Sequence, residues 1–123
     1  MIRIIYFSII LIGCSSPPQE GIEIINAEKL IELQKAGTVV VDIRTLKEYD
    51  QGHLPGVIHI DFFSSDFLER IKEQDTSNPL IIHCASGGRS RKAAEMLQEA
   101  GFKLIYDYKG GFSDWKSKGL DIE

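Results

Sequence analysis

One apolar run constrains the fold of this chain most, because it lacks the regular alternation of polar and apolar positions. Residues 80–84 are Leu, Ile, Ile, His and Cys, and a glycine-rich turn and a helical pattern follow them. Residues 38–43 form a second, mostly β-branched run. Strands of this kind are covered on both faces, as in a parallel sheet that lies between layers of helices. The two runs therefore predict an α/β fold.

The remaining patterns alternate between strand and helix along the chain. Strands are expected at residues 22–25, 38–43, 57–60, 80–84 and 104–108. Helices are expected at residues 27–36, 45–51, 65–72, 89–100 and 111–118. Asn26 is expected to cap the first helix, and Thr45 with Glu48 fits a capping box at the start of the second. This order predicts a mostly parallel sheet with helices on both faces.

Cys84 stands where a predicted strand ends and the next helix begins. Backbone N–H groups without partners and the positive end of the helix dipole stabilise an anion at such a position. The thiol should therefore lose its proton easily and act as a nucleophile. Segments 42–44 and 108–111 end two other predicted strands, and the carboxyl ends of parallel strands meet at one edge of the sheet. We expect a reactive site at that edge.

The composition fits one globular domain, which we assign to residues 22–123. The chain has 123 residues, of which 43% are hydrophobic and 26% charged, and its net charge is −4. That charge and the lack of a basic cluster argue against nucleic acid as a partner. The three histidines are scattered and give little support to a metal site. We expect a monomer without a cofactor.

The first residues are typical of an export signal. Arg3 precedes an apolar run at residues 4–12, which is shorter than the roughly 20 residues of a membrane-spanning helix. Residues 11–14 resemble a bacterial lipobox, which implies cleavage before Cys14 and attachment of lipid to that cysteine. We therefore expect a signal peptide at 1–13, a tether at 14–21, and a lipid anchor facing the periplasm or the cell exterior. An ordinary signal peptide and a buried amino-terminal strand are the alternatives.

Three groups of residues, in this order and at these spacings, resemble the single-domain rhodanese family. Residues 42–44, Glu48 and residues 52–56 look like the first signature of that family. Residues 84–90 look like its active-site loop, and residues 110–111 with Trp115 look like its closing segment. The resemblance covers nearly all of residues 22–123. It implies a five-stranded parallel sheet and a sulfurtransferase that carries sulfur as a cysteine persulfide.

At the site itself, the residues and the resemblance agree on Cys84 as the nucleophile. Its thiolate would take the outer sulfur of a small donor such as thiosulfate, and a thiol or cyanide would accept that sulfur. The loop N–H groups would hold the anionic outer sulfur, and the loop glycines allow the backbone to turn inward. The small side chains that precede those glycines should leave the pocket open. The expected substrate-binding residues are Ala85, Ser86, Gly87, Gly88 and Arg89.

Supporting roles are expected for four polar residues around the loop. Two roles are open for Arg89, which could bind an anionic donor or brace the loop through Asp42 or another acid. The resemblance places Asp42 and Arg44 near the site, either as contacts or as scaffold. Ser90 is expected mainly to stabilise the amino terminus of the helix, and a contact with the substrate is its second possible role.

The histidines and the tryptophan are expected to be structural. His83 neighbours Cys84 on a strand, so the two side chains point to opposite faces and His83 should be packed rather than act as a base. His53 lies in the 52–56 turn, where its ring should bond to the backbone. Trp115 is expected in the core.

Three other functions compete with sulfur transfer. Cysteine phosphatases place five residues between the cysteine and the arginine, whereas four separate Cys84 from Arg89 here. A non-catalytic rhodanese-like binding module is the second alternative. Thiol-redox chemistry is the third, and it would need an outside thiol, since lipid on Cys14 would leave Cys84 as the one free cysteine.

Overall fold

The computed structural model describes residue 13 and residues 20–123. The expected signal peptide up to residue 12, the Cys14 lipidation site and most of the expected tether lie outside the described residues. Among the helices that are described, none has the length and apolar character needed to cross a membrane.

The described strands form one five-stranded sheet in the order β1-β5-β4-β2-β3, and each pairing is parallel. The strands are β1 (Gly21–Ile25), β2 (Val39–Asp42), β3 (Ile58–His59), β4 (Leu80–His83) and β5 (Leu104–Tyr108). The predicted α/β fold with a five-stranded parallel sheet is confirmed. The apolar run at residues 80–84 supplies β4, which lies at the centre of the sheet and is buried at all four of its positions.

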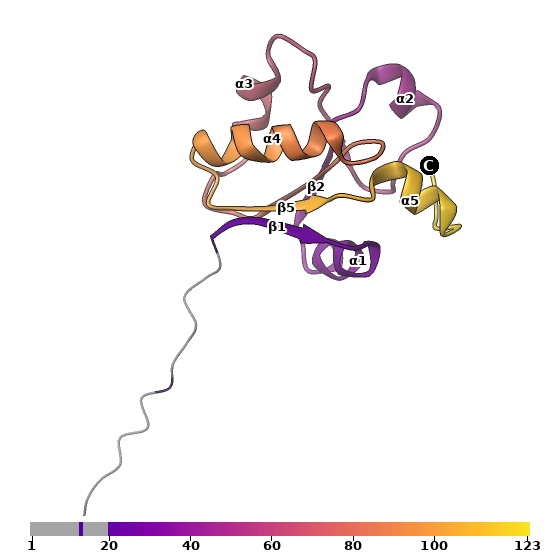
Figure 1. Ribbon diagram of the computed structural model, residues 1–123, viewed down its shortest axis with the longest axis horizontal. Coiled ribbons are helices and arrows are strands. Elements are labelled where there is room, and N and C mark those ends of the chain that lie inside the picture. Colours follow the sequence, from indigo (N-terminus) through magenta and orange to yellow (C-terminus); the bar gives the residue numbers. More distant parts are fainter. Residues whose placement is uncertain (1–12, 14–19) are drawn as a thin grey trace, which may run out of the picture.

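Helices cover both faces of the sheet (Figure 1). They are α1 (Ala27–Lys35), α2 (Leu46–Asp50), α3 (Phe67–Ile71), α4 (Gly88–Glu99) and α5 (Gly111–Ser117). Buried side chains of α3 and α4 pack on one face, and those of α1 and α5 pack on the other. Because neighbouring strand residues point to opposite faces, each buried strand contributes to both hydrophobic clusters.

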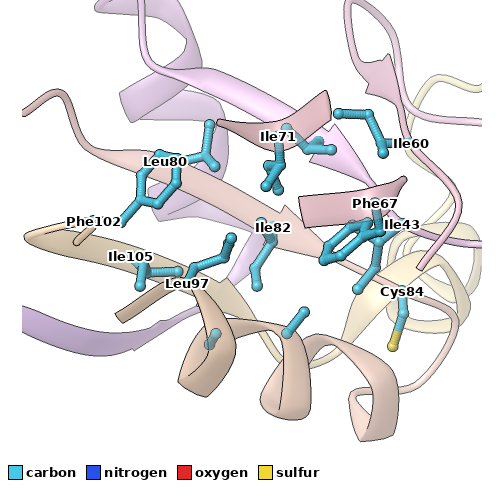
Figure 2. Close-up of a cluster of buried hydrophobic side chains, with 13 residues drawn as sticks. Ile43, Ile60, Phe67, Ile71, Leu80, Ile82, Cys84, Leu97, Phe102 and Ile105 are labelled. Carbon is cyan, nitrogen blue, oxygen red and sulfur yellow. The ribbon is translucent and has the colours of Figure 1, made fainter. Parts of the chain in front are cut away.

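Cys84 belongs to the cluster under α3 and α4. Figure 2 shows it at one end of that cluster, with its sulfur turned away from Ile43 and Phe67. The aliphatic side chains therefore fix the position of the cysteine backbone, while the sulfur faces the loop that leads into α4.

The helix caps form as the sequence predicts. The Asn26 side chain accepts a hydrogen bond from the Lys29 N–H at 2.9 Å, and Thr45 and Glu48 form a reciprocal capping box. The element boundaries differ by one or two residues. Strand β1 begins at Gly21, inside the expected tether, and α3 begins at Phe67 rather than residue 65.

Strand β3 is two residues long, although four were expected. It lies at the edge of the sheet, and among the described strands β2 is its one partner. Its backbone continues alongside β2, since the Ile60 N–H donates to Asp42 O and the Phe62 N–H donates to Ile43 O, each at 3.0 Å. This continuation brings the 61–63 segment to the same edge as Cys84.

Candidate active site

The Cys84 thiol is enclosed by the loop that follows β4. Gly87 donates its backbone N–H to the Cys84 Sγ over 3.1 Å. Its φ is +101°, and a Cβ there would stand 2.7 Å from the Lys109 carbonyl oxygen, so a larger residue would collide with the backbone. Glycine at position 87 thus allows the loop to turn its amide toward the sulfur.

Two opposing effects set the acidity of this thiol. Burial raises the pKa of Cys84, whereas the backbone N–H groups of Ser90, Gly87 and Ser86 and the Ser90 hydroxyl lower it. The net result is a pKa below the ordinary value for cysteine. The site therefore favours a thiolate, the form of sulfur that acts as a nucleophile.

The start of α5 fixes the orientation of the loop peptides. The Phe112 N–H donates to the Cys84 carbonyl oxygen at 2.9 Å, and the Ser113 N–H donates to that of Ala85 at 3.0 Å. In a trans peptide the N–H points away from the C=O. Holding both carbonyl groups on α5 therefore turns the following N–H groups away from that helix. Gly111 permits this contact, because a Cβ there would lie 2.5 Å from the Cys84 carbonyl oxygen.

Arg89 braces the loop against α2. Its two terminal nitrogens donate to the two carboxylate oxygens of Glu48, at 2.7 and 2.9 Å. This paired hydrogen bond lowers the pKa of Glu48 to about 2, and it is also the largest cause of the raised pKa of Arg89. Of the two roles left open for Arg89, the contacts support bracing through an acid, which is Glu48 and not Asp42.

Asp42 and Arg44 form a buried ion pair beside the site. The Arg44 side chain donates to both carboxylate oxygens of Asp42, with the shortest distance 2.8 Å. It also donates to the carbonyl oxygens of Glu48 and Gly52. Its guanidinium carbon lies 4.1 Å from the centre of the Phe112 ring. This pair links β2, α2, the 52–56 turn and α5, and it supports the scaffolding role.

The remaining polar residues are held by internal contacts. Ser90 is fully buried in the first turn of α4, and its hydroxyl donates to the Gly87 carbonyl oxygen at 3.2 Å. His83 is fully buried, and burial lowers its pKa. Its Nδ1 lies 3.0 Å from the backbone carbonyl oxygen of Cys84, so its hydrogen bond is to the backbone of that residue and not to the thiol. His83 is therefore packed behind the site, as predicted.

His53 and Trp115 also occupy the expected structural positions. Nδ1 of His53 lies 2.9 Å from the Leu54 carbonyl oxygen within the turn, and Trp115 is only 4% exposed in the cluster beneath α1. His59 contacts the Arg44 carbonyl oxygen through Nε2 at 2.7 Å. Within the described part of the chain, no three side chains of His, Cys, Asp or Glu gather as metal ligands.

The expectation of an open pocket at the thiol is wrong. Cys84 is 1% exposed, because the loop curls tightly enough to bring the Gly87 amide onto the sulfur. Ser86 and Gly88 are exposed, so the loop itself separates the thiol from solvent. A cavity of about 310 Å³ adjoins Gly87, but its lining includes Asp107 and not Cys84.

Two contributors to the site were not predicted from the sequence. Glu48 was assigned only to the capping box and the family signature, although it also binds Arg89. Gly111 was noted as part of the closing segment, without the carbonyl contact that requires it. The buried Asp107, which lies on the same face of the sheet as Cys84, was not predicted either. An acid at the end of an otherwise apolar strand was the available signal for that residue.

Comparison of the sequence with known proteins finds one family and its members. The model of the Rhodanese-like domain family matches residues 26–118. A relative named thiosulfate sulfurtransferase GlpE, from Pseudomonas entomophila, is 38% identical over 94 residues, which cover 76% of this chain and 84% of the relative. Another, thiosulfate sulfurtransferase 16, chloroplastic, from Arabidopsis thaliana, is 37% identical over 99 residues, covering 72% of this chain and 82% of the relative.

Solved structures agree with the sequence comparison. A rhodanese-related protein from Thermoplasma volcanium superimposes with a TM-score of 0.71 and 30% identity, over 82% of this chain and 97% of that one. A rhodanese-like domain protein from Staphylococcus aureus gives a TM-score of 0.69 and 25% identity, over 82% and 98% of the two chains. Together with the loop geometry, these matches show that the chain belongs to the rhodanese-like domain family.

Proposed function

We propose that this protein is a sulfurtransferase that carries sulfane sulfur as a persulfide on Cys84. The observation that carries the proposal is the Gly87 N–H directed at the Cys84 Sγ at 3.1 Å, in a loop whose amides lower the pKa of the thiol. Amide dipoles that favour a thiolate also favour the anionic outer sulfur of a persulfide. The relatives named thiosulfate sulfurtransferase support the same reaction.

The reaction proceeds in two half-reactions through one covalent intermediate. The Cys84 thiolate attacks the outer sulfur of thiosulfate, the S–S bond of the donor breaks, and sulfite leaves with the bonding electrons. An acceptor thiolate or cyanide then attacks the outer sulfur of the persulfide. The persulfide bond breaks, Cys84 is regenerated as a thiolate, and the acceptor leaves as a persulfide or as thiocyanate.

Access to the sulfur is part of this proposal. Because Cys84 is 1% exposed, a donor reaches it only when the 85–88 loop moves away from the sulfur. Arg89 and Glu48 hold one end of that loop, and the carbonyl contacts of α5 hold the other. We therefore assign binding of the transferred sulfur to the loop amides and bracing of the loop to Arg89.

The test is mass spectrometry of the protein after treatment with thiosulfate. We expect the wild-type chain to gain one sulfur atom on Cys84 and to release it to cyanide. Cys84→Ser should gain none while keeping the circular dichroism spectrum of the wild type. Sulfur uptake elsewhere, or turnover that persists in Cys84→Ser, would falsify the assignment.

The burial of Cys84 favours one alternative, a non-catalytic rhodanese-like binding module. The same experiment separates the two functions, since a binding module would leave Cys84 without added sulfur under every donor tested. An aryl phosphate assayed in parallel addresses phosphatase chemistry. If the protein releases phosphate and takes up no sulfur, it is a phosphatase and the sulfurtransferase proposal is wrong.

We also propose that the protein is exported and anchored to a bacterial membrane by lipid on Cys14. The lipobox-like residues 11–14 and the polar, proline-bearing segment that follows support this proposal. Metabolic labelling with a palmitate analogue should mark the wild-type protein and not Cys14→Ser. Equal labelling of the two, or none of the wild type, would rule out lipidation at this cysteine.

A further inference from the structure

The cavity of about 310 Å³ beside the active-site loop has no part in the reaction described so far. Helix α4 lies over β5 and β1 on this face of the sheet (Figure 1). The cavity is lined by Ile24 of β1, Asp107 of β5, Gly87, Arg91 of α4, and Lys109. Its volume is at the lower end of the range of small-molecule sites, so it admits a ligand of about the size of an amino acid.

Asp107 is a buried acid in the wall of this cavity. It is 1% exposed, and neither of its carboxyl oxygens has a hydrogen-bond partner within the described structure. On the neighbouring strands, the residues at its paired positions are Ile24 of β1 and Ile82 of β4, which are both apolar. A buried carboxyl group without hydrogen bonds is costly. A ligand that brings N–H donors into the cavity would remove that cost.

Two exposed cations line the same cavity. None of the ion pairs between described residues includes Lys109. Arg91 donates from Nε to Glu95 at 3.2 Å, and its two terminal nitrogens make no hydrogen bond within the described part of the chain. The cavity thus combines a buried acid with two cations nearer to solvent. This combination matches a ligand that carries an ammonium group and a carboxylate on neighbouring atoms.

The cavity lies close to the reacting sulfur. Gly87 separates the two, because it lines the cavity and its N–H donates to the Cys84 Sγ at 3.1 Å. Asp107 pairs with Ile82, two residues before Cys84, so strand spacing and rise place the Cα atoms of Asp107 and Cys84 roughly 8 Å apart. The Lys109 side chain passes beside the same glycine, since a Cβ at Gly87 would stand 3.2 Å from its Cγ. A small thiol held in the cavity therefore reaches Cys84 when the loop opens.

We propose that this cavity binds the α-amino acid group of a small thiol acceptor, of which free cysteine is the simplest example. The ammonium group donates to the carboxyl oxygens of Asp107, and the carboxylate pairs with Lys109 and Arg91. The acceptor thiol loses its proton to solvent, and its thiolate attacks the outer sulfur of the Cys84 persulfide. The S–S bond of that persulfide breaks, and its electrons return to Cys84, so the products are the Cys84 thiolate and cysteine persulfide. The inference rests on the proposed function, because it names the acceptor of the transferred sulfur.

The first experiment measures binding without sulfur chemistry. L-2-aminobutyrate has the shape of cysteine with a methyl group in place of the thiol, so it cannot accept sulfur. A nuclear magnetic resonance titration of the full chain should show saturable shifts of the Gly87 and Lys109 amide signals. Butyrate lacks the ammonium group and propylamine lacks the carboxylate, so each should bind about tenfold more weakly. Asp107→Asn should weaken the binding of L-2-aminobutyrate by about the same factor.

The second experiment measures sulfur transfer from wild-type and variant chains that have been loaded with thiosulfate and freed of excess donor. The acceptors are L-cysteine, cysteamine, which lacks the carboxylate, and 3-mercaptopropionate, which lacks the ammonium group. The second-order rate constant of each variant is divided by that of the wild type with the same acceptor, so differences in thiol reactivity cancel.

Asp107→Asn should lower this ratio about tenfold for L-cysteine and cysteamine, and not for 3-mercaptopropionate. Lys109→Gln should lower it about threefold for L-cysteine and 3-mercaptopropionate, and not for cysteamine, because Arg91 remains as the second cation. Lys92→Gln is the matched control, since it removes the same charge from an exposed position of α4 that does not line the cavity. It should react with all three acceptors as the wild type does.

Three results would overturn the inference. They are L-2-aminobutyrate binding no more tightly than butyrate and propylamine, equal losses with all three acceptors in Asp107→Asn, or the same rates in Lys109→Gln as in Lys92→Gln. If circular dichroism shows that Asp107→Asn does not fold, the wild-type titrations and Lys109→Gln decide the question. Failure of wild-type Cys84 to take up sulfur would instead refute the proposed function, and the titration with L-2-aminobutyrate would then decide by itself what the cavity binds.

Discussion

At the residue scale, backbone contacts rather than side-chain bases control the Cys84 sulfur. Burial alone would raise the pKa of the thiol, and the loop amides reverse that effect. The amides can do so because two glycines allow close backbone approaches. Gly87 lies close to the Lys109 carbonyl oxygen, and Gly111 lies close to the carbonyl oxygens of Cys84 and Ala85.

Gly111→Ala should destabilise the protein and disturb the thiol together. The new Cβ would meet the carbonyl oxygens of Cys84 and Ala85 at 2.5 and 2.7 Å, at a φ of +63°. We expect a loss of about 3 kcal/mol, from about 1 kcal/mol of left-handed strain and about 1 kcal/mol for each displaced hydrogen bond. Urea unfolding measures the loss, and thiolate absorbance should show a raised Cys84 pKa.

Gly119→Ala is the matched control for that substitution. Gly119 has a φ of +66°, and a Cβ there would meet nothing within 4 Å. It should therefore show only the left-handed strain, about 1 kcal/mol, with the thiol pKa unchanged. Equal losses in the two variants would mean that the contact of Gly111 with the loop carbonyls contributes nothing.

At the element scale, the short helix α2 depends on polar contacts. It has five residues, none of them buried, so hydrophobic packing does little to hold it. Its capping box and the Arg44 contacts to the Glu48 and Gly52 carbonyl groups fix it beside the site. Glu48 thereby serves two purposes, since the same carboxylate caps α2 and binds Arg89.

The bond between Glu48 and Arg89 should make stability depend on acid pH. The pKa of Glu48 is about 2 in the folded protein, against an ordinary value of 4.5. A lowered pKa means that this contribution is complete above about pH 4.5 and disappears as the pH falls toward about 2. Glu48→Gln should cost about 1–2 kcal/mol at pH 6, an amount reduced by the partial exposure of the pair.

Urea unfolding of the wild type and Glu48→Gln at a series of pH values measures this difference. The gap between the two proteins should close as the pH is lowered below 4.5. Glu95→Gln, which removes an exposed pair with Arg91 in α4, should cost less than about 0.5 kcal/mol at each pH. A gap for Glu48→Gln that stays constant down to pH 2.5 would contradict the assignment of the lowered pKa to this bond.

At the scale of the whole molecule, the parallel sheet gathers the site at one edge. Segments after β2, β4 and β5 meet there because all five described strands run in the same direction. The same convergence closes the site, since α2 holds the 85–88 loop through Arg89 and α5 holds it through the carbonyl contacts. Reaction at Cys84 therefore requires local opening of this edge.

Reagent size should consequently control the reactivity of Cys84. Iodoacetamide needs only a small opening, whereas a polyethylene glycol maleimide needs a large one. Relative to the ratio in the urea-unfolded chain, the folded protein should disfavour the bulky reagent by at least about tenfold. Peptide mapping restricts the measurement to Cys84, and the Cys84→Ser chain is the blank. The same ratio in the folded and unfolded chains would show that the thiol is freely accessible.

The fold was predictable from the sequence because its signals are local. The uninterrupted apolar runs predicted β2 and β4, and the side chains of Asn26 and Thr45 predicted the starts of α1 and α2. Strand β3 was overestimated because the strand-like pattern extends over residues 57–60, whereas Ile58 and His59 alone are paired with β2 among the described residues. The predicted ends of the other elements differ from the observed ends by at most two residues, which is the usual uncertainty at the ends of helices and strands.

The sequence by itself determined the order of the elements and the position of a single cysteine between β4 and α4, since periodicity and contacts between near neighbours decide both. Only the tertiary structure decided that Glu48 meets Arg89, 41 positions away, that the loop closes over the thiol, and that Asp107 faces the same side as Cys84. These features depend on which strands become neighbours in the sheet. That choice is made by the packing of the whole chain and leaves no local pattern.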